Sequence, residues 1–320
     1  MIDVAGKRTN TPVQYLLPML IAILLPIAAC NRQQSASATA GPRTFASPEA
    51  AGKALADATK SQDQKELLQI LGPGSADIIS TGDAAEDKAS LNGFAQAYQV
   101  MNRWRKLTDA SELLLVGADN QAFPIPLLKN AAGQWYFNAT AGKEEILSRR
   151  VGHDEITAIG ACAAVADAQS QYYSQKHGGI KQYAQKFISD AGQQDGLYWE
   201  SPPGTPRSPL GPLVAYATAE GYKVKPNQHQ PFYGYYFVML DKQGPDAKGG
   251  AKNYIVNGKM TSGFAVVAYP AKYGESGVTT FIINHDGVTF QKDLGKTTEE
   301  IASAMTEFNP DQSWHVVEQH

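Results

Sequence analysis

The sequence reads HQPFYGYYFVMLDKQGPDAKGGAKNYIVNGKMTSGFAVVAYPAKYGESGVTTFIINHDGVTFQKDLG over residues 229–295 and is most strongly patterned there. Four runs in this stretch are rich in the aromatic and β-branched residues that strands favour: 233–240, 253–256, 263–269 and 279–283. Asn284-His-Asp-Gly287 predicts a tight hairpin turn into a returning strand at 288–292, since Asp-Gly suits positive φ angles. The stretch therefore predicts an antiparallel sheet.

Flanking segments extend this sheet into a C-terminal antiparallel β-rich domain, which we expect over residues 180–320. The run 299–308 has apolar residues at helical spacing and predicts a helix. The segment 195–213 is rich in proline and aromatic residues, which favours an ordered cover packed on the sheet. We expect any function to lie where this cover meets the sheet.

The N-terminal half predicts helices first and strands afterwards. Ser47-Pro48-Glu49 is a helix start, with Ser as the cap and Pro in the first turn. Helices are then expected at 48–60, 61–70 and 86–106, and short strands at 112–116, 122–128 and 134–137. This order resembles the cone-shaped α+β fold of the nuclear-transport-factor-2-like superfamily, a likeness of fold that carries no function.

Helical patterns also cover 142–152 and 154–176. We place an N-terminal α+β domain at 45–152 and a connecting helix at 153–179, so the fold class is α+β with two domains. The net charge of −3 gives no general reason to expect nucleic acid as a partner.

The first 30 residues are typical of an exported bacterial lipoprotein. Lys7 and Arg8 precede an apolar run at 16–29, which is shorter than the ~20 residues that span a bilayer. Ile27-Ala28-Ala29-Cys30 resembles a lipobox, which implies cleavage of a signal peptide at 1–29 and acylation of Cys30, palmitate being a typical acyl group. The alternatives are an ordinary signal peptide and an uncleaved anchor.

A polar tether is expected to follow the lipidated residue, over 30–44. The membrane would then be a partner through Cys30, and the protein would face the periplasm of the cell envelope. Asn31 in place of Asp favours sorting to the outer membrane. Cys162 would be the one remaining thiol, and its alanine-rich helical surroundings favour a buried structural role over a catalytic one.

Catalytic motifs are missing from the sequence. It contains no HExxH, CxxC or GxSxG pattern, so we assign no catalytic residue, no metal site and no cofactor. The acids of His153-Asp154-Glu155 are interpreted as a favourable helix start, and Asp286 as a turn residue. An enzyme remains an open alternative, but a non-enzymatic protein is preferred.

Aromatic residues provide the candidate binding site. A groove for a peptide or a glycan could be lined by Tyr198, Trp199, Tyr233, Tyr235 and Tyr236. The alternative is that these residues belong to the core and to the faces of the sheet, because strands favour aromatic residues in any case.

Several pieces of the sequence, in order, are similar to a bacterial family of unknown function, numbered 2950. They include Leu71-Gly-Pro-Gly74, Gly196-Leu-Tyr-Trp199, Ser208-Pro-Leu-Gly-Pro212 and Gly263-Phe-Ala-Val-Val-Ala-Tyr-Pro270. The resemblance implies an exported protein and supplies no catalytic residues.

Three hypotheses follow for the function. The first is a lipid-anchored envelope protein that binds or scaffolds another envelope component. The second is an envelope hydrolase whose site lies between the domains, built from residues such as His153, Asp195, and His285 with Asp286. The third is capture of a small ligand in the N-terminal cone, which requires an open apolar cavity there.

Overall fold

The computed structural model describes residues 41–202, 204–223 and 229–318. The expected signal peptide at 1–29, Cys30 and most of the expected tether lie outside these ranges. Contacts divide the chain into residues 1–38 and 39–320, and everything below concerns the second of these units. Within the described ranges, no helix is both long and apolar enough to cross a bilayer.

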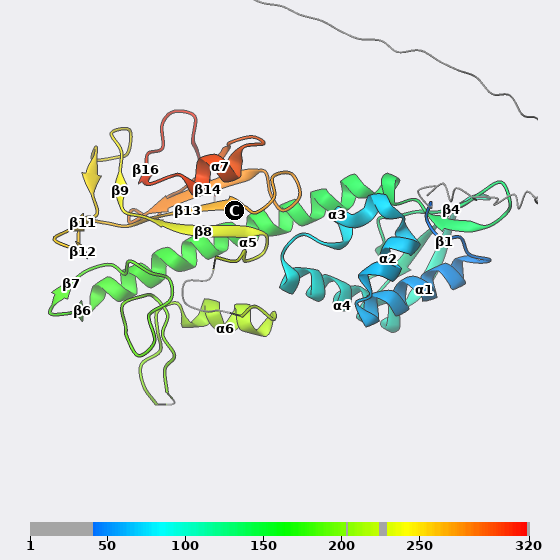
Figure 1. The fold of residues 1–320 in the computed structure, drawn as a ribbon, viewed down its shortest axis with the longest axis horizontal. Coiled ribbons are helices and arrows are strands. Elements are labelled where there is room, and N and C mark those ends of the chain that lie inside the picture. The colour runs from blue at the N-terminus through cyan, green and yellow to red at the C-terminus, as the bar shows by residue number, and fades with distance from the viewer. Residues whose placement is uncertain (1–40, 203, 224–228, 319–320) are drawn as a thin grey trace, which may run out of the picture. The chain divides into compact units, whose positions relative to one another are not determined.

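The most strongly patterned stretch forms the centre of a five-stranded sheet in which every neighbouring pair is antiparallel (Figure 1). In spatial order, its strands are β17 (His315–Val316), β15 (Thr289–Asp293), β14 (Thr279–Asn284), β13 (Ala265–Pro270) and β8 (Tyr235–Leu240). The predicted hairpin turn is confirmed, because Gly287 has a φ of 74° and its amide donates to the Asn284 carbonyl at 2.9 Å.

The expected strand at 253–256 is divided into two short pairings beside this sheet. In one of them, β10 (Lys252–Asn253) pairs with β9 (Lys242–Gln243). In the other, β11 (Ile255–Val256) pairs with β12 (Lys259–Met260). Tyr254, which is fully buried between the two, donates to the Gln243 side chain at 3.0 Å.

A single helix of 36 residues, α5 (Ala139–Ser174), replaces the two predicted helical sections. It runs unbroken through Gly152, so His153 and Asp154 lie in mid-helix, and their interpretation as a helix start is wrong. The second half of α5 packs on the large sheet, where Cys162, Val165 and Ala168 form a core with strand residues (Figure 1).

The opposite face of the large sheet is covered by shorter elements. They are α7 (Thr298–Ser303) and β16 (Glu307–Phe308), the latter pairing in parallel with β9. The predicted helix at 299–308 therefore ends early, since residues 307–308 pair with β9 instead of continuing the helix. A further helix, α6 (Gly211–Ala219), contributes Val214 to the core on the α5 side, and β6 (Lys176–His177) forms a hairpin with β7 (Ile180–Lys181).

The N-terminal half has the expected helices followed by strands. Ser47 caps the first helix by accepting from the Ala50 amide at 3.2 Å, as predicted. The helices are α1 (Pro48–Ser61), α2 (Gln64–Leu71), a 3-10 turn (Pro73–Ser75), α3 (Ala76–Ile79) and α4 (Ala84–Val100). The predicted helix at 86–106 is wrong beyond Val100, because pairing with the next strand overrides helical spacing and places Trp104 in a strand.

A second antiparallel sheet has the order β1-β2-β4-β5, with β3 beside β2. Its strands are β1 (Asn102–Thr108), β2 (Ser111–Val116), β3 (Gln121–Ala122), β4 (Leu127–Lys129) and β5 (Trp135–Phe137). Leu55 and Ile70 from the helices pack with Ile125 and Phe137 in one core. Helices and antiparallel sheets together confirm the α+β class.

Candidate functional site

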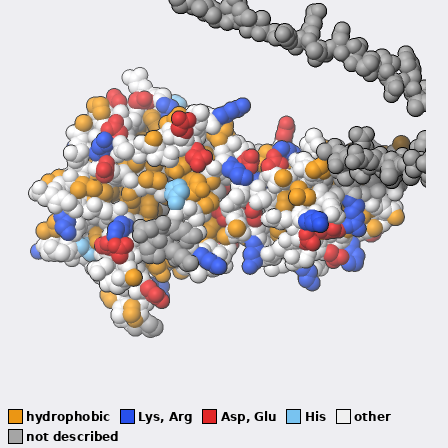
Figure 2. Space-filling view, viewed as in Figure 1, with side chains coloured by type: hydrophobic (Ala, Val, Ile, Leu, Met, Phe, Trp, Pro, Cys, Tyr) orange, Lys and Arg blue, Asp and Glu red, His pale blue; other side chains and the backbone are white. Residues whose placement is uncertain are grey.

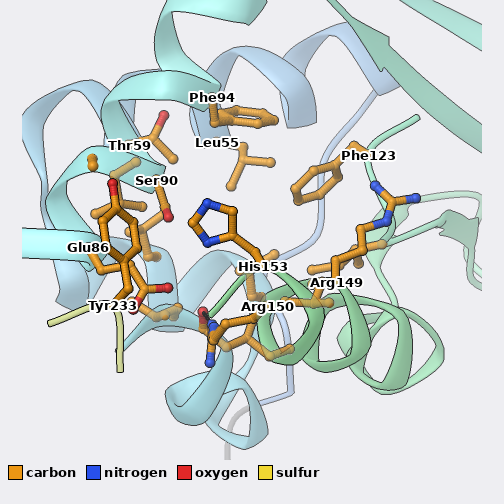
Figure 3. Close-up of a pocket in the computed structure, with 18 residues that line it drawn as sticks. Leu55, Thr59, Glu86, Ser90, Phe94, Phe123, Arg149, Arg150, His153 and Tyr233 are labelled. Carbon is orange, nitrogen blue, oxygen red and sulfur yellow. Dashed lines mark hydrogen bonds between the residues drawn. The ribbon is translucent and has the colours of Figure 1, made fainter. Parts of the chain in front are cut away.

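A cavity of about 520 Å³ lies among the N-terminal helices, the segment around Phe123 and the first half of α5. Its wall is mainly aliphatic and aromatic, and includes Leu55, Leu67, Leu71, Ile78, Ile79, Leu91, Phe94, Phe123, Ile125 and Ile146. Polar side chains also line it: Thr59, Glu86, Ser90, Arg149, Arg150, His153 and Tyr233. Figure 3 shows Glu86 and Tyr233 on one side, Arg149 on the other and His153 between them. The cavity is thus apolar over most of its surface, with ionisable groups at several places on its wall.

Helical periodicity brings four residues of α5 to this cavity. Ile146, Arg149, Arg150 and His153 follow the i, i+3, i+4, i+7 spacing of one helical face. Figure 3 shows the His153 ring projecting from α5 into the space between Leu55 and Ser90. Asp154 is the next residue along α5 and is fully buried.

The start of α4 places Glu86 on the wall. Asp83 caps this helix, because its Oδ1 accepts from the amides of Ala85 at 3.1 Å and Glu86 at 3.2 Å. Three acidic residues therefore occupy five positions at the helix start, where the helix dipole favours negative charge. Asp87, the third of them, accepts from the Ser80 hydroxyl at 3.0 Å and the Thr81 amide at 2.9 Å.

The C-terminal half contacts the start of α4 through Tyr222, Tyr233 and Gly234. The Tyr222 hydroxyl donates to Asp83 Oδ2 at 2.8 Å and accepts from the Tyr233 amide at 2.9 Å. The Gly234 amide donates to the same Asp83 oxygen at 3.3 Å. The Tyr233 ring then lies 5.1 Å from that of His153, centre to centre. Asp83 therefore joins residues more than a hundred positions apart.

Gly234 is required by this close approach. Its φ is 66°, and a Cβ built on it would lie 2.5 Å from Ser276 Cβ and 2.7 Å from Asp154 Oδ2. Any side chain at this position would collide with the buried carboxyl group of α5. The contact between the two halves depends on backbone packed directly against Asp154.

Two of the buried carboxyl groups each have one oxygen without a hydrogen-bond partner among the described residues. Glu86 is 7% exposed, and among the described residues no donor reaches its Oε2. Asp154 contacts His153 Nδ1 at 3.2 Å through Oδ1, while its Oδ2 is also without a partner in the part of the chain that the structure describes. A buried carboxyl oxygen without a partner lowers the stability of the fold and is rare in native proteins. This region is therefore a candidate functional site.

Burial raises the pKa of Glu86 to about 8, and the negative charges of Asp154 and Asp83 act in the same direction. Burial likewise raises the pKa of Asp154 to about 8, although the Arg150 guanidinium opposes the rise. At neutral pH both groups therefore hold a proton in most molecules. The hydroxyl pKa values of Tyr222 and Tyr233 are raised as well, mainly by burial.

The two arginines on the wall are already engaged. Arg150 donates to the carbonyls of Asp77 at 2.9 Å and Ile78 at 2.8 Å, near the end of α3. Arg149 pairs with Glu145 at 2.6 Å between Nε and Oε1. Among the described residues, no group of three His, Cys, Asp or Glu side chains could hold a metal ion.

The residues considered for a hydrolase do not converge. Of the set, His153 lines the cavity. Asp195 is half-exposed in a loop, with its Oδ2 at 2.6 Å from Lys186 Nζ. His285 lies in the C-terminal half against Tyr254, with its ring centre 5.7 Å from the tyrosine ring. The structure therefore does not bring these residues together into the site between domains that the hydrolase alternative required.

The five candidate aromatic residues also lie in different places. Tyr198 and Trp199 line an open hollow of about 780 Å³ formed by residues 188–202. Tyr233 lines the N-terminal cavity. Tyr235 is fully buried and donates to the Thr279 carbonyl at 2.8 Å, while Tyr236 stacks on His229 with ring centres 4.2 Å apart. Ligand binding by these residues stays a prediction.

Sequence reasoning missed Glu86 and the role of Asp154. Acids at a helix start are usually explained by capping and the helix dipole, and the start of α4 satisfies that explanation. A usable signal was the density of ionisable residues from Arg149 to Asp154 within a helical pattern. Residues such as Glu86, which lie near this cluster through tertiary packing, can be identified only from the folded structure.

The comparisons with known proteins identify a family but assign no chemical activity. The family model described as Protein of unknown function (DUF2950) matches residues 42–317. The chain belongs to this family. The match covers most of the chain and confirms the resemblance found in the sequence. No curated protein and no solved structure matches.

Proposed function

We propose that this member of the family is a lipid-anchored protein of the bacterial cell envelope that captures a small amphipathic molecule in its N-terminal cavity. The observation that carries the proposal is the cavity itself, of about 520 Å³, apolar on most of its wall with a few ionisable groups among the lining residues. Small-molecule sites typically measure ~300–1,000 Å³ and combine an apolar lining with few polar groups.

The envelope location rests on the sequence of the first 30 residues. The basic pair Lys7 and Arg8, the apolar run 16–29 and Cys30 occur in the order of a lipoprotein signal. Acylation at Cys30 would hold the folded part close to the periplasmic face of a membrane, with the outer membrane favoured by Asn31. Another envelope protein, a peptide or a glycan is a further partner under this proposal.

The cone-like description of the N-terminal half belongs to the same proposal. Helices α1, α2 and α4 pack with strand residues in one core, and the cavity beside this core is lined by helices and by Phe123 and Ile125, which lie between β3 and β4. A nuclear-transport-factor-2-like cone would provide such a space, and ligand capture is a natural use of it. This likeness concerns architecture and carries no substrate.

An envelope hydrolase is the second candidate, favoured by one observation. Glu86, whose pKa is raised to about 8, lies in the same cavity as His153, and a carboxyl group that holds its proton at neutral pH can act as a general acid. We prefer binding because the other residues considered for catalysis lie elsewhere in the fold.

The test of ligand capture is binding of a neutral apolar fluorophore, N-phenyl-1-naphthylamine, to the mature chain, followed by its fluorescence. We expect saturable binding that Ala89→Trp weakens at least tenfold, because Ala89 lines the cavity and the larger ring would fill it. Gln96→Trp is the matched control, since this residue is exposed on the same helix and does not line the cavity. Equal weakening by both variants, or no saturable binding, would overturn the proposal.

A further inference from the structure

We propose that the captured molecule carries a cationic nitrogen that binds against Glu86, with its apolar body filling the rest of the cavity. This inference rests on the proposed function and names the chemical class of the ligand. It follows from an unpartnered buried carboxyl group and from the charges around it.

Among the described residues of the wall, the buried side-chain oxygen without a hydrogen-bond partner belongs to Glu86. Its neighbours in the α4 start are satisfied: Asp83 accepts four hydrogen bonds, and Asp87 accepts two. Glu86 lines the cavity, is 7% exposed and has no donor at Oε2 among the described residues. A ligand with N–H donors would supply the missing partner.

The charges near Glu86 favour a cation. Asp83 and Asp87 flank it on α4, and Asp154 approaches it from α5. Arg150 is the one cation that opposes these three acids in their effect on Glu86. A positive group placed here would pair with the ionised form of Glu86, whereas a carboxylate or phosphate would add one more acidic group to a cluster of four.

In the described part of this wall, the two arginines are already partly engaged. Arg150 spends both terminal nitrogens on backbone carbonyls of α3, and Arg149 is paired with Glu145. Each guanidinium keeps further N–H groups beyond these contacts, so it is the acidic side chains around Glu86 that disfavour fatty acids and phosphate esters at this end of the cavity. Figure 2 shows acidic and basic side chains interspersed on the face in view, and that mixture does not select a charge.

The ring of Tyr233 adds a second attraction. Figure 3 shows it beside Glu86, on the side of the cavity away from Arg149. Aromatic faces attract cations, most strongly where water is excluded. The apolar body of the ligand would then extend toward Phe94 and Phe123, whose ring centres are 5.1 Å apart.

Proton release is the measurable signature of this arrangement. Glu86 is mostly protonated at neutral pH in the empty cavity, because burial and neighbouring acids raise its pKa to about 8. A bound ammonium group stabilises the ionised carboxylate, so the proton leaves to solvent as the ion pair forms. A neutral alcohol of the same length would bind without releasing it.

The experiment compares n-decylamine, n-decanol and n-decanoate as ligands of the mature chain by titration calorimetry at neutral pH, in two buffers of different ionisation enthalpy. We expect the amine to bind at least tenfold more tightly than the alcohol and to release most of one proton per molecule bound. Decanoate should bind most weakly. These wild-type measurements test the inference even if a variant fails to fold.

Glu86→Gln should remove the preference for the amine and the proton release, while leaving the affinity for decanol within about twofold. Glu144→Gln, an exposed change in the first half of α5 away from the cavity wall, should behave as the wild type. Binding of decanol with no preference for the amine, or tighter binding of decanoate, overturns this inference and leaves ligand capture standing. Failure of all three probes overturns both proposals.

Discussion

The two halves of α5 make opposite kinds of contact. Beyond Ala158 the helix presents small apolar residues such as Cys162 and Ala168 to the large sheet, and they pack with no more than 1% exposure. Before that point the same helix presents Arg149, Arg150 and His153 to a cavity. One continuous helix therefore serves a filled core at one end and an open, ionisable space at the other.

The filled core contributes to the stability of the fold, whereas the cavity reduces it. Filled cores gain both area burial and dispersion contacts, whereas a cavity whose wall includes a buried carboxyl group with an unpartnered oxygen lowers the net stability of the fold. Such a cost is typical of regions that bind or react. The predictions below change one side of the contrast at a time.

The largest expected effect is on the pH dependence of stability. Folded Glu86 holds its proton up to a pKa of about 8, while the unfolded chain releases it near 4.5, so the free energy of unfolding falls as pH rises between these values. The full span corresponds to as much as roughly 5 kcal/mol. Glu86→Gln should remove the share of this slope that Glu86 contributes and leave the share of Asp154, whose pKa is also raised to about 8, as measured by urea unfolding across the range.

Glu144→Gln serves as the control for that measurement, because the residue is exposed and its loss should leave the curve unchanged. Superimposable pH profiles for the wild type and Glu86→Gln would contradict the assignment of a buried, protonated carboxyl group to the cavity wall.

Asp83→Ala comes next, because it breaks the hydrogen bonds that join the two halves beside the cavity. It removes the cap of α4 and leaves the Tyr222 hydroxyl and the Gly234 amide without their acceptor. We expect a loss of about 3–4 kcal/mol in the free energy of unfolding, measured by denaturant titration.

The matched control is Asp63→Ala. Asp63 caps α2 through the Glu66 amide at 3.0 Å but is exposed, and its loss should cost only about 1 kcal/mol. Equal losses for the two variants would mean that the contacts of Asp83 with the C-terminal half contribute nothing beyond an ordinary cap.

Ala168→Leu and Ala89→Leu add the same side-chain atoms to the filled core and to the cavity, so that their effects on stability can be compared. Ala168 is 1% exposed between α5 and the large sheet, so the added atoms should cost about 1–3 kcal/mol through overpacking. Ala89 lines the cavity, and the same change there should shift stability by less than about 0.5 kcal/mol. Thermal unfolding of the pair measures the difference, and a larger loss at Ala89 would refute the contrast.

The smallest effect on folding is expected for Cys30→Ser, because the sequence predicts a polar tether after this residue. Its free energy of unfolding should stay within about 0.5 kcal/mol of the wild type. Incorporation of labelled palmitate and recovery in the membrane fraction should both be lost. A serine variant that still sediments with membranes would argue against acylation as the anchor.

Most elements could be predicted from the sequence where a local rule acts alone. Ser47 and Pro48 mark a helix start through capping chemistry, and Asp286-Gly287 marks a turn through backbone freedom. Trp104 was misassigned to a helix because strand pairing, a contact between separate segments, decides its conformation. Boundaries failed where tertiary pairing overrode local preference.

The candidate site was harder to predict than the fold. Gly152 and His153 indicated a break in the helical pattern, yet α5 passes through both, supported by packing at either end. Glu86 and Asp154 are 68 positions apart and acquire their raised pKa values from burial that no local pattern records. Only the third functional hypothesis, which required a cavity, anticipated the kind of feature that the structure contains.

The buried thiol of Cys162 can report how often the core between α5 and the large sheet opens. Burial raises its pKa to about 12 and leaves it fully inaccessible, so a thiol reagent can modify it only in molecules whose core has opened. With Cys30 replaced or acylated, no other thiol competes for the reagent. The labelling rate therefore counts opening events of the sheet-facing half of α5 under native conditions.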